Sequence, residues 1–174
     1  MIISVEEAKK HITTTVDDSV LEAKLQALEL LIRKHTNNNF QKRAFRTVGT
    51  FEEGKLYCDT GKFFKAGDTI QITESDYNAG LYVISEIADD VITIEGSMDE
   101  TDVLITKVEY PVDVKMGVVN MLKWDLENRG KVGIQSETIS RHSVTYFNMD
   151  GNNSSLGYPK SLLGFLKPYM KARF

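Results

Sequence analysis

The sequence predicts an α+β fold in which a helical bundle body is interrupted by a small antiparallel β-barrel or sandwich insertion. Apolar residues recur with a helical period in residues 1–46 and 110–174, whereas the stretch between them favours short strands. The charge changes at the same places, because residues 47–109 carry 4 Lys and Arg against 14 Asp and Glu while both flanks are mildly basic. We therefore expect residues 1–46 and 110–174 to form one helical body, and residues 47–109 to form an inserted acidic β-module.

The N-terminal segment predicts a short helix followed by a long one. Ser4 and Glu7 have the spacing of a capping box, which predicts a helix over residues 5–11. Asp17 and Asp18 open the second helix. Its apolar stripe steps by four, three, four and three residues, at Leu21, Leu25, Leu28, Ile32 and His35. Asparagine tolerates the left-handed backbone of a helix C-terminus, so the asparagine-rich residues 36–39 are expected to end this helix.

The middle segment has the period of β-strands. Polar and apolar residues alternate over residues 69–73 and 81–85, while residues 91–94 and 103–106 are rich in β-branched side chains. Turn-forming residues separate these runs, and weaker strands are expected at residues 47–51 and 55–58. Several short strands at this spacing are typical of a small barrel or sandwich.

The C-terminal segment returns to helix. Pro111 suits the first position of a helix whose apolar residues cover most of its circumference, which predicts a central, buried helix closed by Gly130. Residues 134–147 are expected to be extended. A last short helix is expected to begin at Pro159 and to end at Pro168, before a basic and aromatic tail.

Composition excludes several classes of protein. The chain has 174 residues and a formal net charge of -4, so it is no generic nucleic-acid binder. Cys58 is the single cysteine, which rules out an intramolecular disulfide and favours a reducing compartment. No apolar run approaches the roughly 20 residues that span a bilayer, and the N-terminus lacks the pattern of a secretory signal. We therefore expect synthesis in a cytoplasm and no membrane contact.

No motif predicts catalysis, a cofactor or a metal site. His11, His35 and His142 lie far from Cys58 and from one another in the sequence, so no ligand spacing occurs. The tripeptide at residues 59–61, Asp-Thr-Gly, resembles the signature of retroviral-type aspartic proteases, in which two carboxylates share a proton. Lys62 follows where that family has a small residue, and the family's downstream glycine-rich motif is missing. The alternative interpretation of residues 59–61 is a hairpin turn. Taken together, these observations predict a protein that is not an enzyme.

The order of segments resembles the head–tail connector, or adaptor, proteins of long-tailed bacteriophages. Residues 4–9, followed by Asp17-Asp18 and the leucine-rich helix, are similar to the opening of that family. Residues 133–139 and 143–146 are similar to its C-terminal half, as is the ending at 158–163 and 166–169. Residues 66–70 and 78–83 are similar to β-modules of phage particle proteins, and the larger insertion departs from the family's shortest members.

This resemblance implies a ring, typically a dodecamer, that lies beneath the portal protein at the head–tail interface of the virion. DNA would pass through the ring with transient, non-specific contacts, and the ring would offer a platform to a stopper or tail-completion protein. Because many ring proteins close only on a template, a monomeric free protein is compatible with this interpretation. The implied portal contacts are Lys167, Tyr169, Lys171, Arg173 and Phe174, and the implied subunit or channel contacts are Thr138, Arg141, His142, Thr145 and Tyr146.

Three alternative functions remain open at this point. Another virion assembly protein, such as a tail-completion factor, would share the same kinds of ring contact. A DNA-binding regulator would need an exposed recognition helix, which the apolar central helix does not offer. The aspartic protease depends on Asp59 alone.

Overall fold

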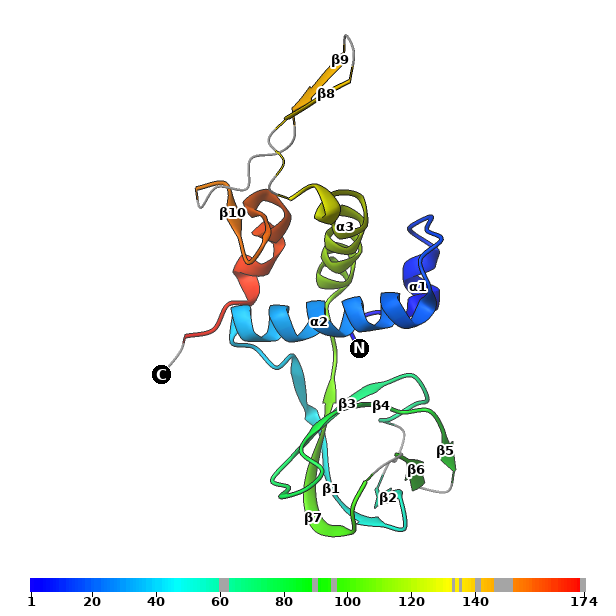
Figure 1. The fold of residues 1–174 in the computed structure, drawn as a ribbon. Helices are drawn as coiled ribbons and strands as arrows, with labels where there is room; N and C mark the ends of the chain where they lie inside the picture. The colour runs from blue at the N-terminus through cyan, green and yellow to red at the C-terminus, as the bar shows by residue number, and fades with distance from the viewer. Residues whose placement is uncertain are drawn as a thin grey trace. The chain divides into compact units, whose positions relative to one another are not determined.

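A computed structural model describes residues 1–59, 63–88, 91–94, 97–132, 134, 136–139, 142–145 and 152–172 (Figure 1). The chain divides into two compact units. The first, here called the β unit, contains Met1 and Asn38–Tyr110. The second, the helical unit, contains Ile2–Asn37 and Pro111–Phe174.

The expected helical bundle with a barrel or sandwich insertion is wrong. The chain is α+β with a β-rich core, and its main feature is a curled seven-stranded antiparallel sheet that forms a half-barrel. Residues 41–46, which the prediction placed in the helical body, begin the first long strand, because Gln41 and Arg46 pair with residues 108 and 106 of the sheet. Among the described residues, only two α-helices are longer than one or two turns.

The seven-stranded sheet has the order β4-β3-β7-β1-β2-β6-β5, and every neighbouring pair is antiparallel. The long strands β1 and β7 lie side by side near its middle, and β7 also pairs with β3. The bounds are β1 Gln41–Glu52, β2 Lys55–Cys58, β3 Thr69–Thr73, β4 Gly80–Val83, β5 Ile87–Ala88, β6 Val91–Thr93 and β7 Glu100–Val108.

Alternating apolar residues form the core of the β unit. Ile70 and Ile72 on β3 are buried, as are Val103 and Ile105 on β7, because side chains two positions apart face the same side of a sheet. Gly49 on β1 lies beneath Ile105: a Cβ there would lie 2.6 Å from the Ile105 Cδ1 atom. Glycine at this position therefore lets the two central strands pack closely.

The two ends of the β unit are fastened to each other. Gln41 pairs with Val108 at the ends of β1 and β7. The backbone N–H of Glu109 donates to the Phe40 carbonyl at 3.0 Å, and the Phe40 and Tyr110 rings lie 4.9 Å apart. The chain consequently enters and leaves this unit at neighbouring points.

The helical unit begins with α1 (Val5–Lys9) and α2 (Asp18–Thr36). The Ser4 hydroxyl accepts the Glu7 N–H and Asp17 accepts the Ser19 N–H, so both predicted N-termini are confirmed. Asn37 ends α2 in the left-handed conformation, with a φ of 49°. The predicted apolar stripe is buried at Leu21, Leu25, Leu28 and Ile32, whereas His35 is half-buried.

The central helix α3 (Val112–Asn128) packs against α2 and against the C-terminal 3-10 helix η2 (Lys160–Tyr169). Pro111 is the N-cap of α3 rather than its first residue, and the short 3-10 helix η1 (Arg129–Lys131) follows. The predicted last helix is a 3-10 helix, and Pro168 lies inside its final turn instead of ending it. Gly117 on α3 is buried directly beneath the Phe165 ring of η2.

Two small antiparallel sheets complete the helical unit. One joins β8 (Ser136–Ile139) to β9 (His142–Thr145), and the other joins β10 (Ser154–Ser155) to β11 (Tyr158–Pro159). The second sheet was not predicted, because residues 150–155 have the composition of a polar loop. In the described part of the chain, no helix combines the length and the apolar character needed to cross a bilayer.

Candidate functional site

The described residues contain no assembled metal centre. Nowhere among them do three or more His, Cys, Asp or Glu residues gather in a way that could hold a metal ion. Asp59, on which the protease alternative depends, is exposed just after β2, and the two residues that follow it lie outside the described ranges.

The C-terminal tail is held at several points. The Lys171 N–H donates to the Thr36 carbonyl at 2.8 Å, and the Asn37 side-chain amide donates to the Ala172 carbonyl at 2.6 Å. The last carbonyls of a helix have no partner within the helix, so the tail satisfies one at the end of α2. Of the candidate portal contacts, Lys167 and Lys171 are exposed, while Arg173 and Phe174 lie outside the described residues.

Tyr169, the remaining candidate portal contact, is half-buried against α3. Its hydroxyl donates to the Asp113 carboxylate, with oxygen–oxygen distances of 2.7 and 2.8 Å. This hydrogen bond raises the pKa of Tyr169, because the carboxylate favours the protonated phenol. Tyr169 therefore anchors the tail to α3, and its hydroxyl is already bonded within the chain.

Three of the five predicted subunit contacts, Thr138, His142 and Thr145, fall on the β8–β9 ribbon, which is the two-stranded sheet of those strands (Figure 1). Thr138 pairs with Ser143, and His142 pairs with Ile139. Thr145, at the end of β9, is exposed. Arg141 and Tyr146 lie outside the described residues.

The ribbon has the features of a strand pair that needs a partner. Among the described strands, β8 and β9 pair only with each other, so each has one backbone edge available for a further strand. A two-stranded sheet alone is at best marginally stable in water. The ribbon would therefore gain stability from any surface that supplies a third strand or an apolar face.

A buried carboxylate joins three parts of the helical unit. Asp125 on α3 has 8% of its side chain exposed and forms ion pairs with Lys24 of α2 and with Arg129. The Arg129 Nε lies 2.5 Å from an Asp125 oxygen, and the Tyr158 hydroxyl lies 3.3 Å from the same oxygen. Arg129 also donates to the Gly157 carbonyl at 3.0 Å.

Aromatic rings enclose the Arg129 side of this cluster. The guanidinium lies 5.2 Å from the centre of the Trp124 ring and 4.7 Å from that of Tyr158. The two rings are themselves 5.4 Å apart. Cation–π contacts of this kind add to the ion pair and fix the side-chain geometry. Sequence reasoning missed the cluster, although the four-residue spacing of Asp125 and Arg129 was a usable signal.

The pKa of Asp125 reflects two opposing effects. Burial raises it, but hydrogen bonds and charge attraction from Lys24 and Arg129 outweigh burial and hold the pKa below its ordinary value. The same partnership raises the pKa of Arg129, although burial acts against it. Tyr158 has a raised pKa because it is buried and lies beside the Asp125 charge.

Acid should therefore weaken the helical unit through Asp125. A lowered folded-state pKa means that the stabilisation is complete above the unfolded value of about 3.9 and is lost as pH falls through the folded-state pKa. We expect the difference in unfolding free energy between wild type and Asp125→Asn to be constant from pH 7 to pH 5 and to shrink below about pH 4. Urea unfolding followed by Trp124 fluorescence measures this difference. A gap that stays the same at pH 3 would contradict the assignment.

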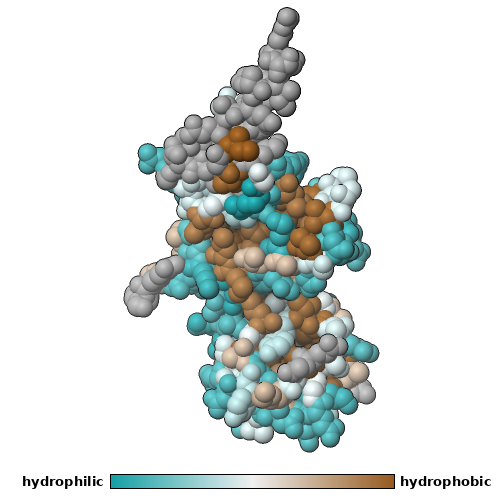
Figure 2. Space-filling model, viewed as in Figure 1, coloured by the Kyte–Doolittle hydropathy of each residue, from teal (hydrophilic) through white to brown (hydrophobic). Residues whose placement is uncertain are grey.

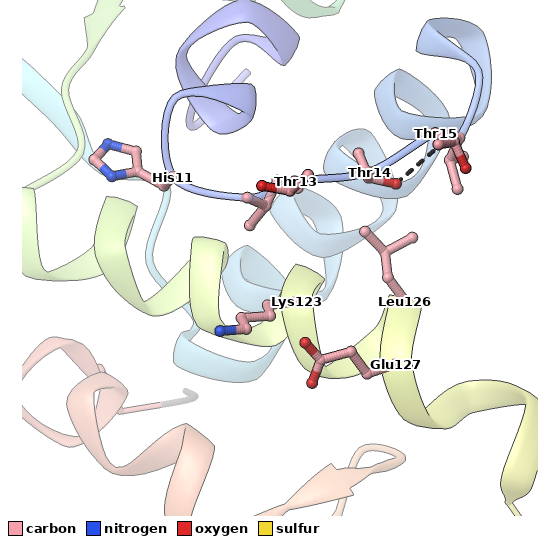
Figure 3. Close-up of a pocket in the computed structure, with 9 residues that line it drawn as sticks. His11, Thr13, Thr14, Thr15, Lys123, Leu126 and Glu127 are labelled. Atoms are coloured by element: carbon pink, nitrogen blue, oxygen red, sulfur yellow. Dashed lines mark hydrogen bonds between the residues drawn. The ribbon is translucent and has the colours of Figure 1, made fainter.

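An open pocket of about 660 Å³ lies between the α1–α2 connection and α3 (Figure 3). One wall is the threonine-rich stretch, residues 13–15, in which Thr14 accepts the Val16 N–H at 3.2 Å. The other wall is α3. Leu126 points from it toward Thr14 and Thr15, and Lys123 and Glu127 of the same helix also line the pocket. These groups offer hydroxyl and apolar surface to a ligand or a chain segment, and we assign them no reaction.

The helical unit also exposes large apolar side chains. Brown apolar patches lie among teal polar surface in Figure 2. In α2 and α3 the exposed apolar residues are Val20, Leu30, Val112 and Met116. Apolar residues scattered singly over a surface are normal, so these four residues alone do not mark an interface.

Comparisons with known proteins leave the family open. No protein-family model matches the sequence, and no curated protein matches it significantly.

Proposed function

We propose that this chain is a structural head–tail connector of a bacteriophage or prophage. It would form a ring beneath the portal protein, let DNA pass and provide a platform for stopper or tail-completion proteins. The C-terminal tail carries the proposal, because its backbone is fixed at Thr36 and Asn37 while Lys167 and Lys171 remain exposed. A basic segment that is already ordered loses little conformational entropy when it binds an acidic partner.

Two further features support a ring that surrounds DNA. The β8–β9 ribbon, with its available edges, is suited to contact a neighbouring subunit by strand addition. The net charge of -4 keeps contacts with DNA weak, since a channel that neutralised many phosphates would hold the DNA instead of letting it pass. The expected location is the head–tail interface of the virion, after synthesis in the bacterial host cytoplasm.

Charge reversal in the tail should weaken binding to the portal. We expect the double variant Lys167→Glu/Lys171→Glu to bind the portal protein encoded in the same genome region at least about tenfold more weakly, because it places like charges at an acidic surface. The Tyr169–Asp113 hydrogen bond and the Thr36 backbone contact do not involve these side chains, so the fold should persist. A pull-down with purified portal, quantified by titration, measures the effect.

The double variant Lys10→Glu/Lys123→Glu is the matched control, because it reverses two exposed charges elsewhere in the helical unit and should leave portal binding unchanged. Portal binding that is equally strong in both variants would move the contact away from the tail. If no portal binding occurs and a stopper or tail protein is bound instead, a tail-completion factor replaces the connector as the preferred function.

A further inference from the structure

Five of the six described cations of the β unit gather at one end of its two central strands; the sixth, Lys55, pairs with Glu52 at the other end. Lys42 stands near the start of β1 and Lys107 near the end of β7, where Gln41 pairs with Val108. Lys107 donates to the Phe63 carbonyl at 3.0 Å, which brings the segment that follows β2 to this end. We call this end the basic pole; its cations are Lys42, Arg43, Arg46, Lys65 and Lys107.

An aromatic pair lies within the basic pole. The rings of Phe45 and Phe63 stack 5.1 Å apart, and the Lys42 ammonium lies 4.8 Å from the centre of the Phe45 ring. Phe63 is nevertheless 51% exposed. Asp68 and Glu109 pair with two of the five cations, so the pole keeps a net positive charge. An exposed ring among cations is suited to an acidic partner that also carries apolar side chains.

The opposite end of the same strands is acidic, where Phe51 pairs with Glu100. Tyr77 and Met98 protrude there, with 68% and 62% exposed. We call this end the acidic pole; its carboxylates are Glu52, Glu53, Asp76, Asp99, Glu100 and Asp102.

Hydrogen bonds fix the shape of the acidic pole. Glu100 accepts from the Ser75 hydroxyl at 2.6 Å and from the Asn78 side-chain amide at 2.8 Å. Asn78 also accepts the Met98 N–H at 2.9 Å and donates to its carbonyl at 2.8 Å. The exposed Met98 is therefore presented on a rigid turn, which reduces the entropy lost on binding.

We propose that the basic pole of one copy of this chain docks on the acidic pole of a second copy, in a head-to-tail contact between β units. Glu100 and Lys107 are seven residues apart on β7, which separates the poles by roughly 23 Å, so the two surfaces cannot satisfy each other within one chain. A contact between different surfaces of identical subunits is heterologous, and it closes into a ring when the rotation permits. The inference rests on the proposed function for the closed ring, and the contact itself is tested separately.

A charge-exchange experiment tests the docking. One full-length variant, Arg43→Glu/Lys65→Glu, leaves the basic pole with a net negative charge. The other, Glu52→Lys/Glu53→Lys/Asp76→Lys, leaves the acidic pole with a net positive charge once Lys55, which pairs with Glu52, is counted. All five side chains are exposed, and the internal bonds of the poles use other side chains or the backbone. Each variant is examined alone and mixed in equal amounts with the other, at low and high salt. Analytical ultracentrifugation and carbodiimide cross-linking of carboxylates to lysines give the association.

Each variant alone should cross-link at least about tenfold less than wild type, because like charges then face each other. The equimolar mixture should restore association at low salt and lose it in 1 M salt, where charges are screened. Association that is equal in wild type, in each variant and in the mixture overturns the proposal, as does a mixture that stays monomeric. Binding of duplex DNA that depends on Arg43 and Lys65, without self-association, would also overturn it. Portal binding in the pull-down is independent of these poles, so failure here is distinguishable from failure of the connector function.

Discussion

Replacing Asp125 with alanine is expected to lower the free energy of unfolding by about 2 kcal/mol. The substitution removes the shared partner of Lys24 and Arg129, and it takes an acceptor from Tyr158. Loss of one member of a buried ion pair costs about 3–5 kcal/mol when the other charge stays buried. Lys24 and Arg129 keep 33% and 40% of their side chains exposed, so both can regain water and the expected loss is smaller.

Chemical unfolding followed by Trp124 fluorescence measures this loss, because the only tryptophan lies beside Arg129 and Tyr158. Glu127→Ala is the matched control: it removes an exposed carboxylate two residues away on α3 and should change stability by no more than about 0.5 kcal/mol. Equal unfolding midpoints for the Asp125 and Glu127 variants would show that the cluster contributes nothing measurable to stability.

Replacing Gly117 with alanine is expected to lower the free energy of unfolding by about 2 kcal/mol. Alanine normally stabilises a helix by about 1 kcal/mol relative to glycine, but a Cβ at this position would overlap the ring of Phe165. The ring must move out of its packed position, and η2 would be displaced from α3. Thermal or urea unfolding measures the loss.

Gly164→Ala supplies the control, because a Cβ there meets no heavy atom within 4 Å. A second test uses Phe165→Leu as the background, in which the smaller side chain should reduce the penalty of Gly117→Ala. A penalty that is unchanged in that background would show that the effect of alanine does not come from the ring of Phe165.

Local signals in the sequence were sufficient for the helices and several strands. The Ser4 and Asp17 caps and the buried leucine stripe of α2 follow from spacing alone. Strands β2 and β3 have the predicted bounds, because alternation and flanking turn residues define them locally. These features depend on residues a few positions apart, which is the range over which sequence patterns are informative.

The sheet order was not predictable in the same way. β7 lies between β1 and β3, so residues 49 to 67 positions apart form its ladder with β1. The ladder contains register shifts, and it depends on the close approach of Ile105 to Gly49. A glycine in a strand indicates close packing or a bulge, but nothing in the sequence names the partner strand.

The candidate functional sites divide in the same way. Composition alone predicted the basic tail and the extended stretch over residues 134–147. It did not predict that Thr36 and Asp113 anchor the tail. The sequence showed that residues 47–109 carry far more carboxylates than cations, but only as a sum over the segment. Its separation into two poles needed the pairing of β1 with β7, which places Lys107 and Glu100 at opposite ends.

The fastening of Phe40 to Glu109 and Tyr110 has a consequence for how the chain tolerates an insertion of this size. The entropy lost in closing a loop grows with the length of disordered chain between its ends. Because the β unit holds its own ends together, the gap that residues 38–110 leave between α2 and α3 is about as short as a tight turn. The helical unit can therefore fold with little entropic penalty from the insertion, and the β unit can vary in length or be exchanged without altering where the chain leaves α2 and enters α3.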